Sequence, residues 1–438
     1  MTPMWRNWAS DQHCAPVAHH HPARDEDIAA IIARAMAEQR SVRVAGAGHS
    51  FSDIVLTNGH LIELDRMASV LDADRESGLV KVQAGITLRA LNRRLDELGL
   101  ALENLGDIDA QSLAGAVATA THGTGARLAN LSAQVAELDL VLADGTIHTV
   151  GVDDPEQLRA ARVSLGALGV VTSLTLRCVP AFGLHAVDAP VPLADTLADL
   201  DSLVDSNDHF EFFVFPHSDL ALTRTNNRTE GPRQPRSRRK AWVDDVLLGQ
   251  HVFHAACLAG RALPGRIPAI NRAVSRAVGV SERTDRSWEI FASPRTVRFT
   301  EMEVAIRREH AVAGIERIRA LVAERGFAVN FPIEVRFVAG DDAFLSPAAG
   351  RDTCYLAVHV FRGMEWEPFF AAVAEALGEL GGRPHWGKRH FGTAADLRER
   401  YPEWDRFAAV RAQLDPDGRF ANPHTDRVLG RVAVPAGV

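Results

Sequence analysis

Residues 43–53 read Arg43-Val44-Ala45-Gly46-Ala47-Gly48-His49-Ser50-Phe51-Ser52-Asp53. A short β-like start runs into two glycines one residue apart, and a histidine, a serine and an aromatic residue follow. Glycines with this spacing let the backbone pass close to a ligand and turn its N–H groups toward phosphate oxygens. The third glycine of the Rossmann dinucleotide fingerprint would fall at Phe51, and no amphipathic helix begins there. The stretch therefore predicts a phosphate-bearing cofactor held in another way, with His49 beside it.

A second glycine-rich stretch is Ser112-Leu113-Ala114-Gly115-Ala116-Val117-Ala118-Thr119-Ala120-Thr121-His122-Gly123-Thr124-Gly125. Small side chains let a ligand approach closely, and hydroxyl and amide groups satisfy a pyrophosphate. A tightly packed helix start followed by a loop would have the same composition. Taken alone, the stretch fits both interpretations equally, but together with residues 43–53 it favours the cofactor.

Length and composition restrict the class of protein. The 438 residues are too many for one ordinary core and predict two domains, with three as an alternative. A hydrophobic content of 46%, a charged content of 24% and a net charge of -8 are typical of a globular enzyme and argue against nucleic acid as a partner. The sequence contains no run of about 18 apolar residues, so we expect no integral membrane span. The four cysteines lie far apart, which predicts no disulfide framework or zinc site and favours the cytoplasm.

Periodicity predicts an α+β chain whose pattern changes after Pro180. Up to residue 185 we expect helices at 25–38 and 87–98, and short strands at 41–45, 61–64, 79–83, 135–142, 146–150 and 169–179. Beyond it we expect strands at 210–215, 298–306, 333–338 and 355–361, and helices at 310–325 and 369–380. This order predicts a separate antiparallel sheet with helices on one face. Residues 225–240 predict an exposed loop, whose basic cluster Arg236, Arg238, Arg239 and Lys240 fits solvent better than nucleic acid.

Glu334 and Arg336 lie two residues apart on the apolar strand Ile333-Glu334-Val335-Arg336-Phe337. The two-residue period of a strand places both charges on one face and the apolar residues on the other. An ion pair there would hold the guanidinium in position for a ligand. A solvent-facing salt bridge on an edge strand explains the pattern equally well.

Several histidines are candidates for chemistry. His359 lies in the strand 355–361, where a lone histidine is more often a hydrogen-bonded core residue than a base. The segment His385-Trp386-Gly387-Lys388-Arg389-His390 combines cations and rings around a glycine and could bind an anionic or electron-rich group. His19-His20-His21 suggests a metal ligand set, but it lies in a predicted loop with no carboxylate pattern beside it, so we expect no metal site.

The order of these motifs resembles a known family. The motifs are Gly46-Ala47-Gly48-His49-Ser50-Phe51, Thr121-His122-Gly123-Thr124-Gly125, Glu334-x-Arg336 and His385-Trp386-Gly387-Lys388, with Asn7-Trp8 near the start. As an ordered set they resemble the sugar-1,4-lactone oxidases and the related alditol oxidases, flavoenzymes of the vanillyl-alcohol-oxidase type, over nearly the whole chain. Residues 102–109, Leu-Glu-Asn-Leu-Gly-Asp-Ile-Asp, favour the L-gulono-1,4-lactone oxidase or dehydrogenase branch.

The resemblance implies a two-domain α+β fold. In this family an FAD-binding domain is built from the N-terminal part and a returning C-terminal segment, and a cap domain with an antiparallel sheet covers the flavin. We therefore expect an FAD-binding domain at residues 1–185, a cap or substrate domain at 186–381, and a segment at 382–438 that returns to the FAD-binding domain and the active site.

The resemblance also implies the cofactor and the residues that hold it. The histidine at the position of His49 carries the flavin covalently in this family, so we expect a bond from His49 to the 8α-methyl group of FAD; non-covalent FAD beside the histidine is the alternative. The residues expected to line the cofactor are Ala45, Gly46, Ala47, Gly48, His49, Ser50, Gly106, Ser112, Gly115, Thr119, Thr121, His122, Gly123 and Val171.

Five residues carry the expected chemistry, which is hydride transfer from a secondary carbinol to flavin N5. Arg336 or Lys388 would stabilise negative charge on the flavin, Glu334 would orient Arg336 and bind a hydroxyl, and His359 is a candidate proton acceptor. Asp107 stands where alditol oxidases carry a serine and would bind lactone hydroxyls; a turn or N-cap aspartate is its alternative. Glycine at 106 leaves a path to the flavin open for oxygen.

The resulting hypothesis is an FAD-linked oxidoreductase that converts L-gulono-1,4-lactone or a close relative into an ascorbate-type product. The alternatives are an alditol oxidase acting on xylitol or sorbitol, and a flavin-binding protein without turnover. The electron acceptor is left open among oxygen, a cytochrome and a quinone. The cytoplasm is the expected compartment, with association at a membrane surface left open.

Overall fold

The computed structural model describes residues 4–235, 251–293 and 296–432. Its N-terminal part contains a three-stranded parallel sheet in the order β3-β5-β4, formed by β3 (Ala18–His20), β5 (His60–Glu63) and β4 (Val42–Ala45). Helix α1 (Asp25–Ala37) connects β3 to β4 and buries an apolar stripe at helical spacing. The glycine-rich loop that contains His49 therefore begins directly after strand β4.

A five-stranded antiparallel sheet in the order β10-β9-β11-β7-β6 forms the second part of this region. Its strands are β6 (Val70–Asp74), β7 (Leu79–Gln83), β9 (Val135–Val141), β10 (Ile147–Val150) and β11 (Val170–Arg177). Its helices are α2 (Leu88–Glu97), α3 (Leu113–Ala118) and α4 (Pro155–Ala161). The Thr87 side chain caps α2 by accepting from the N–H of Ala90, and Gly99 follows the helix with a positive φ.

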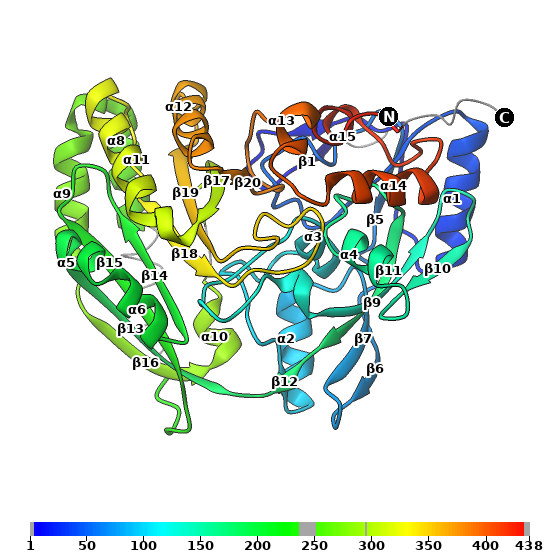
Figure 1. Ribbon diagram of the computed structural model, residues 1–438, viewed down its shortest axis with the longest axis horizontal. Helices are drawn as coiled ribbons and strands as arrows, with labels where there is room; N and C mark the ends of the chain where they lie inside the picture. The colour runs from blue at the N-terminus through cyan, green and yellow to red at the C-terminus, as the bar shows by residue number, and fades with distance from the viewer. Residues whose placement is uncertain (1–3, 236–250, 294–295, 433–438) are drawn as a thin grey trace.

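The third sheet has eight antiparallel strands in the order β16-β13-β15-β14-β18-β19-β17-β20. They are β13 (Gly183–Pro192), β14 (His209–Val214), β15 (Leu220–Thr229), β16 (Ser281–Arg286), β17 (Phe299–Arg307), β18 (Ile333–Val338), β19 (Thr353–Phe361) and β20 (Arg383–Pro384). Figure 1 shows this sheet and its helices on the left, and the N-terminal sheets on the right.

Helices cover one face of the eight-stranded sheet. They are α5 (Leu193–Ala198), α6 (Leu200–Ser206), α11 (Ala311–Arg325) and α12 (Glu367–Gly378). Helices α8 (Phe253–Ala262) and α9 (Ile267–Ala277) belong to the same part of the chain, and Cys257 of α8 packs against Phe331 and Phe361. Apolar residues of α5, α6, α11 and α12 pack against Phe210, Phe212, Met302, Val335 and Val358 of the strands. Since strand side chains alternate between faces, the intervening polar residues face the other way, toward the N-terminal part.

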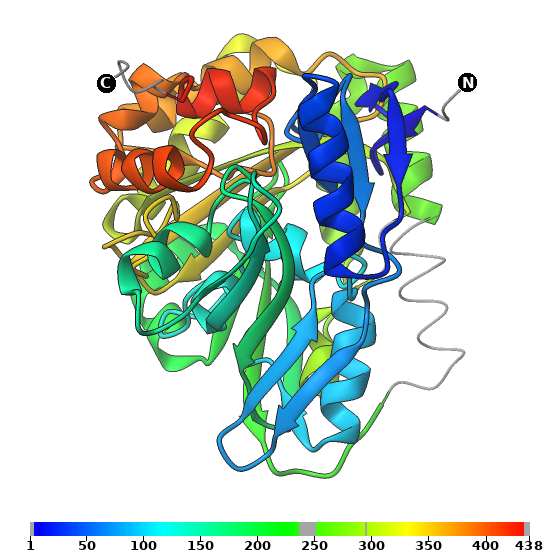
Figure 2. The same cartoon turned by 90° about the vertical axis from the view of Figure 1, so that its right-hand side faces the viewer.

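The C-terminal segment packs on the N-terminal part of the chain. It carries α13 (Ala394–Arg398), α14 (Trp404–Leu414) and α15 (Pro423–Leu429), which Figure 2 shows in red beside the blue N-terminal elements. The buried guanidinium of Arg43 donates to the carbonyls of Ile54, Leu165 and Phe420, and Asn422 donates to the carbonyls of Asp53, Ile54 and Leu56. The ends of the chain therefore jointly fix the loop that follows β4.

Smaller elements complete the structure. They are the pair β1 (Trp5–Arg6) and β2 (His13–Cys14), the pair β8 (Leu100–Ala101) and β12 (Val179–Pro180), and α10 (Ser287–Phe291). Within the described residues, no helix combines the length and the apolar character that crossing a membrane requires.

Two expectations from the sequence are corrected, and a third falls partly outside the described residues. Residues 225–229, expected in a loop, end strand β15, whose polar residues pair in register with β13 over ten positions. The remainder of that expected loop, with its basic cluster, falls partly at 236–250, outside the described residues. The first two histidines of the triplet lie on β3 rather than in a loop, and the carboxylates of Glu63, at the end of the neighbouring strand β5, and of Asp65, just beyond it, lie beside the triplet.

Candidate active site

The site is built on the polar face of the eight-stranded sheet. On four adjacent strands, charged residues alternate with buried apolar ones: Glu211 on β14, Glu334 and Arg336 on β18, His359 on β19, and Glu301 and Glu303 on β17. Because β18 lies between β14 and β19, the interpretation of Glu334 and Arg336 as an edge-strand salt bridge is wrong. Their side chains are each 9% exposed, so the pair is buried.

Two cavities meet beside this polar face. The larger, of about 290 Å³, runs along the loop after β4, and the smaller, of about 80 Å³, lies against the sheet. Both are lined by His49, Ser50, Gln111 and Thr119, so the two spaces adjoin at His49. A long ligand in the larger cavity would reach the smaller one there.

Most of the predicted residues line these cavities. The larger one is lined by Ala45, Gly46, Ala47, Gly48, His49, Ser50, Ser112, Gly115, Thr119 and Val171. The smaller one is lined by Gly106, Asp107, Thr121, His122, Glu334, Arg336, His359 and Lys388. Gly123 borders neither; it packs against Asn104 and a small third cavity.

The larger cavity suits a dinucleotide such as FAD. Its wall is mostly backbone and small side chains, drawn from the loop after β4, from α3 and from residues 164–171. A Cβ at Gly46 would overlap the Ser112 hydroxyl, and Gly48 has a φ of +71°. Glycine at 46 therefore lets the loop after β4 approach the start of α3, and glycine at 48 adopts a backbone conformation that other residues rarely take. Backbone that lines a cavity of this kind is what a pyrophosphate-linked cofactor requires.

His49 stands at the junction as a neutral imidazole. Its ring stacks on Trp8, with centroids 5.6 Å apart. Burial, followed by the positive charges of Lys388 and Arg298, lowers the pKa of His49 to about 4. At neutral pH the ring therefore carries a lone pair that can bond to a carbon or accept a hydrogen bond.

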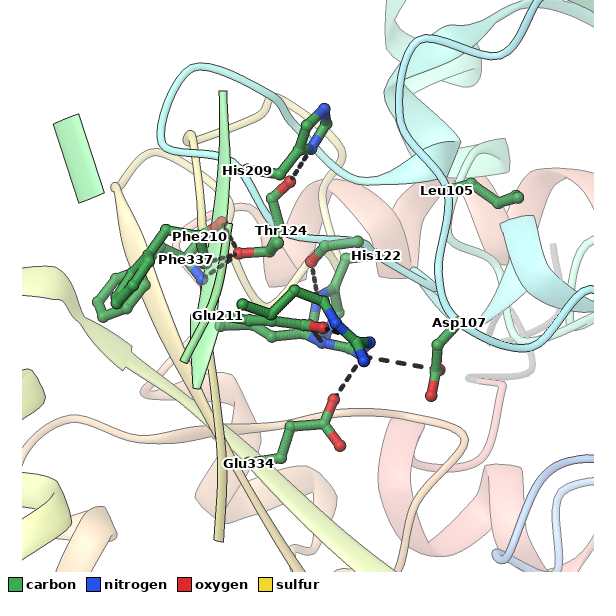
Figure 3. Close-up of polar contacts among 12 residues, drawn as sticks. Leu105, Asp107, His122, Thr124, His209, Phe210, Glu211, Glu334 and Phe337 are labelled. Carbon is green, nitrogen blue, oxygen red and sulfur yellow. Dashed lines mark hydrogen bonds and ion pairs between the residues drawn. The ribbon is translucent and has the colours of Figure 1, made fainter. Parts of the chain in front are cut away.

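Arg336 is the centre of the charged network in the smaller cavity. Its guanidinium lies 2.6 Å from Glu334, 2.7 Å from Glu211 and 3.7 Å from Asp107, and Figure 3 shows these three carboxylates converging on it. Burial by itself lowers the pKa of Arg336, but Glu334, Glu211 and the other carboxylates raise it well above its ordinary value. The cation is thus permanent, and its direction is fixed by several partners.

Glu211, which was not predicted from the sequence, extends this network across the sheet. Asp188, Arg224, Glu211 and Arg336 stand directly opposite one another on β13, β15, β14 and β18. Arg224 bonds Asp188 at 2.5 Å and Glu211 at 3.3 Å. Alternating charges on neighbouring strands therefore form a row that ends at the cavity.

Lys388 is held by a second carboxylate that was also missed. Its Nζ lies 2.6 Å from Glu301 and 5.3 Å from the centre of the Phe51 ring. Burial lowers the pKa of Lys388, but Glu301 and Glu303 together raise it by more than burial lowers it, so the net shift is upward. Across the strand pair, Nε2 of His359 lies 3.6 Å from Glu301 and 4.0 Å from Glu334. His359 thus faces carboxylates that can stabilise its protonated form.

A buried trio completes the wall of the smaller cavity: His122, Glu303 and His385. His122 donates from Nδ1 to the carbonyl of Gly123, and its Nε2 lies 3.1 Å from Glu303. Burial raises the pKa of Glu303, but His122, His385 and Lys388 lower it to a greater extent. His122 is thus held between a carbonyl and a carboxylate, which fixes the orientation of its ring. The trio therefore adds a hydrogen-bonded imidazole–carboxylate pair to the wall of the smaller cavity.

A signal for the missed carboxylates was present in the sequence. Glu301 and Glu303 alternate with apolar residues in Phe299-Thr-Glu-Met-Glu-Val-Ala-Ile-Arg307, as Glu334 and Arg336 do on β18, and Glu211 interrupts the aromatic strand β14. A carboxylate inside an apolar strand needs a buried partner. The pattern alone does not identify that partner, because the partner strands are distant in the sequence.

Comparison with known proteins agrees with this architecture. A family profile described as D-arabinono-1,4-lactone oxidase matches residues 174–428, and one described as FAD binding domain matches residues 16–151. A cholesterol oxidase from Brevibacterium sterolicum has the same fold, with a TM-score of 0.82 at 19% identity over 97% of this chain and 96% of that chain.

Two curated relatives extend over almost the full chain. An L-gulono-1,4-lactone dehydrogenase of Mycobacterium tuberculosis is 49% identical over 434 residues, covering 98% of this chain and 100% of the relative. An alditol oxidase of Streptomyces is 34% identical over 430 residues, covering 95% of this chain and 96% of the relative. The chain, with its FAD-binding domain and its charged sheet face, therefore belongs to the D-arabinono-1,4-lactone oxidase family of flavin-dependent oxidoreductases.

Proposed function

We propose that this protein oxidises a secondary carbinol of a sugar 1,4-lactone, L-gulono-1,4-lactone or a close relative, to an ascorbate-type product. The observation that carries the proposal is the charged cavity around Arg336, which adjoins the cofactor cavity at His49. The name and the 49% identity of the Mycobacterium tuberculosis relative support the lactone as substrate. A hydroxyl-rich lactone suits a small cavity whose polar groups are already fixed by one another.

The charged residues of the smaller cavity divide the reaction among them in this proposal. FAD, when bound in the larger cavity, supplies the hydride acceptor at N5. Arg336 and Lys388 stabilise the negative charge that develops during hydride transfer, because both are held as permanent cations. Glu334 fixes Arg336 and accepts a substrate hydroxyl. His359 takes the hydroxyl proton, and Glu301, 3.6 Å from its Nε2, stabilises the imidazolium that results.

We further propose that residues 1–185 and 382–438 form the FAD-binding domain and that residues 186–381 form the cap. Two separate apolar clusters support this division. One joins the N-terminal sheets to residues of the C-terminal segment, including Trp386, Phe407 and Phe420, and the other lies between the eight-stranded sheet and its helices. Residues 343–345 of the cap also belong to the first cluster, and this contact anchors the cap on the FAD-binding domain.

A covalent bond between His49 and the 8α carbon of FAD is part of the proposal. The neutral imidazole at the junction of the two cavities supports it. Acid precipitation of the purified protein should leave the yellow colour in the pellet, and intact-mass spectrometry should give the chain mass plus one FAD. Release of all flavin into the supernatant would contradict the bond but leave lactone oxidation open.

The reaction is tested by mixing the yellow protein with L-gulono-1,4-lactone without air, following flavin absorbance, and then admitting air. We expect bleaching by the lactone. Fast recolouring would identify oxygen as an acceptor, which the glycine at 106 favours, and slow recolouring would direct the search to a cytochrome or a quinone. Absence of bleaching by this and other sugar 1,4-lactones would contradict the proposed function.

The alternative substrate class is an alditol such as xylitol or sorbitol. Asp107 decides against it in our proposal, because its carboxylate lies 3.7 Å from Arg336 and lines the smaller cavity as a charged hydrogen-bond acceptor. Bleaching by xylitol at a rate equal to that of the lactone would favour the alditol. The Asp107→Ser variant should shift the ratio of the two rates toward the alditol if Asp107 selects the lactone.

The cytoplasm is the proposed compartment. The four cysteines are all free thiols, and three of them are buried. A chain that folds with unpaired thiols fits a reducing compartment. Cell fractionation, with a salt wash of the membrane fraction, would distinguish the cytoplasm from association at a membrane surface.

A further inference from the structure

The histidine triplet near the N-terminus forms a cluster that the proposed reaction does not use. Strand β3 runs parallel to β5, with His19 opposite Leu61 and His20 opposite Ile62. This register places His21 next to Glu63. One nitrogen from His19, one from His21 and one carboxylate oxygen of Glu63 all lie within 4.8 Å of one another.

The alternation of side chains separates this cluster from the neighbouring histidines. His20 points to the opposite face of the strand, where its Nε2 lies 2.9 Å from Nδ1 of His60, and His60 bonds Glu38 at 3.0 Å. His19 and His21 share the other face, with ring centroids 4.8 Å apart. The two faces of β3 therefore carry two independent histidine groups.

The polar atoms of the cluster are arranged as metal ligands usually are. Nε2 of His19 is buried and makes no hydrogen bond within the described residues; its nearest acid is Glu63, at 3.5 Å. His21 is oriented by Asp65, which lies 2.8 Å from its Nδ1, and Glu63 accepts a hydrogen bond of 2.9 Å from the indole of Trp5. Carboxylate and N–H partners of this kind orient the ligands of metal ions.

We propose that His19, His21 and Glu63 bind a late first-row divalent cation, with Zn²⁺ as the ion that best matches two imidazoles and one carboxylate. Such a set fills three positions of a tetrahedral ion and leaves the fourth for water. Asp65, holding Nδ1 of His21, directs the other ring nitrogen to the ion. The sequence alone argued against a metal because the triplet had no adjacent carboxylate; the parallel pairing of β3 with β5 supplies two.

A second histidine and carboxylate cluster is a poorer candidate. His122, Glu303 and His385 also lie within 4.8 Å of one another. There, however, both ring nitrogens of His122 have partners, and Nδ1 of His385 accepts the N–H of Gly387 at 3.1 Å. An ion would have to displace these bonds, whereas the buried nitrogen of His19 has none to lose.

The position of the cluster links the ion to the cofactor. Trp5, Glu63 and Asp65 also line the larger cavity, whereas His19 and His21, within 4.8 Å of the Glu63 carboxylate, do not line it. A bound ion would join β3 to β5 and fix the wall of that cavity. An ion that binds the folded chain but not the unfolded chain stabilises the folded state, so Zn²⁺ should also raise the unfolding temperature of the protein.

The test is metal binding to the chelator-treated, flavin-containing protein. Equilibrium dialysis against ZnCl₂, with metal analysis, should give one tightly bound Zn²⁺ per chain that the double variant His19→Ala/His21→Ala lacks. Asp65→Asn should weaken binding roughly 10–100-fold, the usual effect of removing an outer-shell partner. Co²⁺ provides a second probe, because its visible bands in a site with nitrogen ligands lie to the red of flavin absorbance.

Two controls decide the result. His20→Gln alters the same strand on its other face, and His185→Ala removes an exposed histidine paired with Glu282 on another sheet. Both should bind Zn²⁺ like the unaltered protein, and Zn²⁺ should raise their unfolding temperatures equally. Equal binding by the double variant, loss of binding in His20→Gln to the same degree, or no saturable binding by the unaltered protein would overturn the proposal.

Discussion

At the scale of single residues, the positive charge of Arg336 and the planar shape of its guanidinium should affect the rate of flavin reduction separately. Arg336→Ala should slow anaerobic flavin reduction by the lactone about 10²–10³-fold, the usual cost of losing one donor to developing charge. FAD content should be kept, because Arg336 does not line the larger cavity. Arg336→Lys retains the charge but loses the planar guanidinium that bonds both Glu334 and Glu211. Its rate of flavin reduction should therefore lie between those of the unaltered protein and Arg336→Ala.

Stopped-flow absorbance, with the flavin-to-protein ratio measured on the same samples, checks this expectation. Arg228→Ala is the matched control: it removes an arginine of β15 that contacts Phe182 and lines neither main cavity. Full reduction rate in Arg336→Lys and Arg336→Ala would remove this residue from the reaction. Loss of FAD in both would instead assign Arg336 to the support of the cofactor site.

At the scale of elements, the row of charges across the sheet makes Glu211 a positioning residue. Glu211→Gln keeps the shape but removes the negative charge that faces Arg336, which should weaken their hydrogen bond by about 1.4 kcal/mol. We expect about tenfold slower flavin reduction. Asp188→Asn changes the far end of the same row, on β13, and should leave the rate nearly unchanged. Equal effects from both substitutions would indicate that the row acts only on sheet stability.

Strand alternation predicted much of this sheet but not the order of its strands. The apolar alternation of β17, β18 and β19 marked them in advance, and the glycine-rich loop after β4 marked the cofactor cavity. β15 was missed because its polar residues resemble a loop until β13 and β14 pair with it. For the same reason Glu211 and Glu301 were missed: their partners Arg336 and Lys388 lie more than 80 residues away. Local patterns reveal elements, whereas cross-strand partners depend on topology.

At the scale of the whole molecule, several histidines are buried in neutral form where the two ends of the chain meet. Burial lowers the pKa of His385 to about 3 and lowers that of His390 well below its ordinary value. The unfolded chain binds protons on these rings below pH of about 6.5, while the folded chain does not. Stability is therefore complete above that pH and is lost as the pH falls toward the folded value.

The expected slope is at most about 1.4 kcal/mol per pH unit for each such histidine. Urea unfolding of the flavin-containing protein between about pH 7.5 and 5 measures it. His385→Gln should reduce the slope, because Nδ1 of His385 accepts the N–H of Gly387 and cannot be protonated without losing that bond. The exposed His185→Ala variant should keep the slope. A free energy of unfolding that stays constant down to pH of about 5 would contradict this expectation. It would mean that the histidines are protonated without global unfolding, through local opening of the segments that bury them.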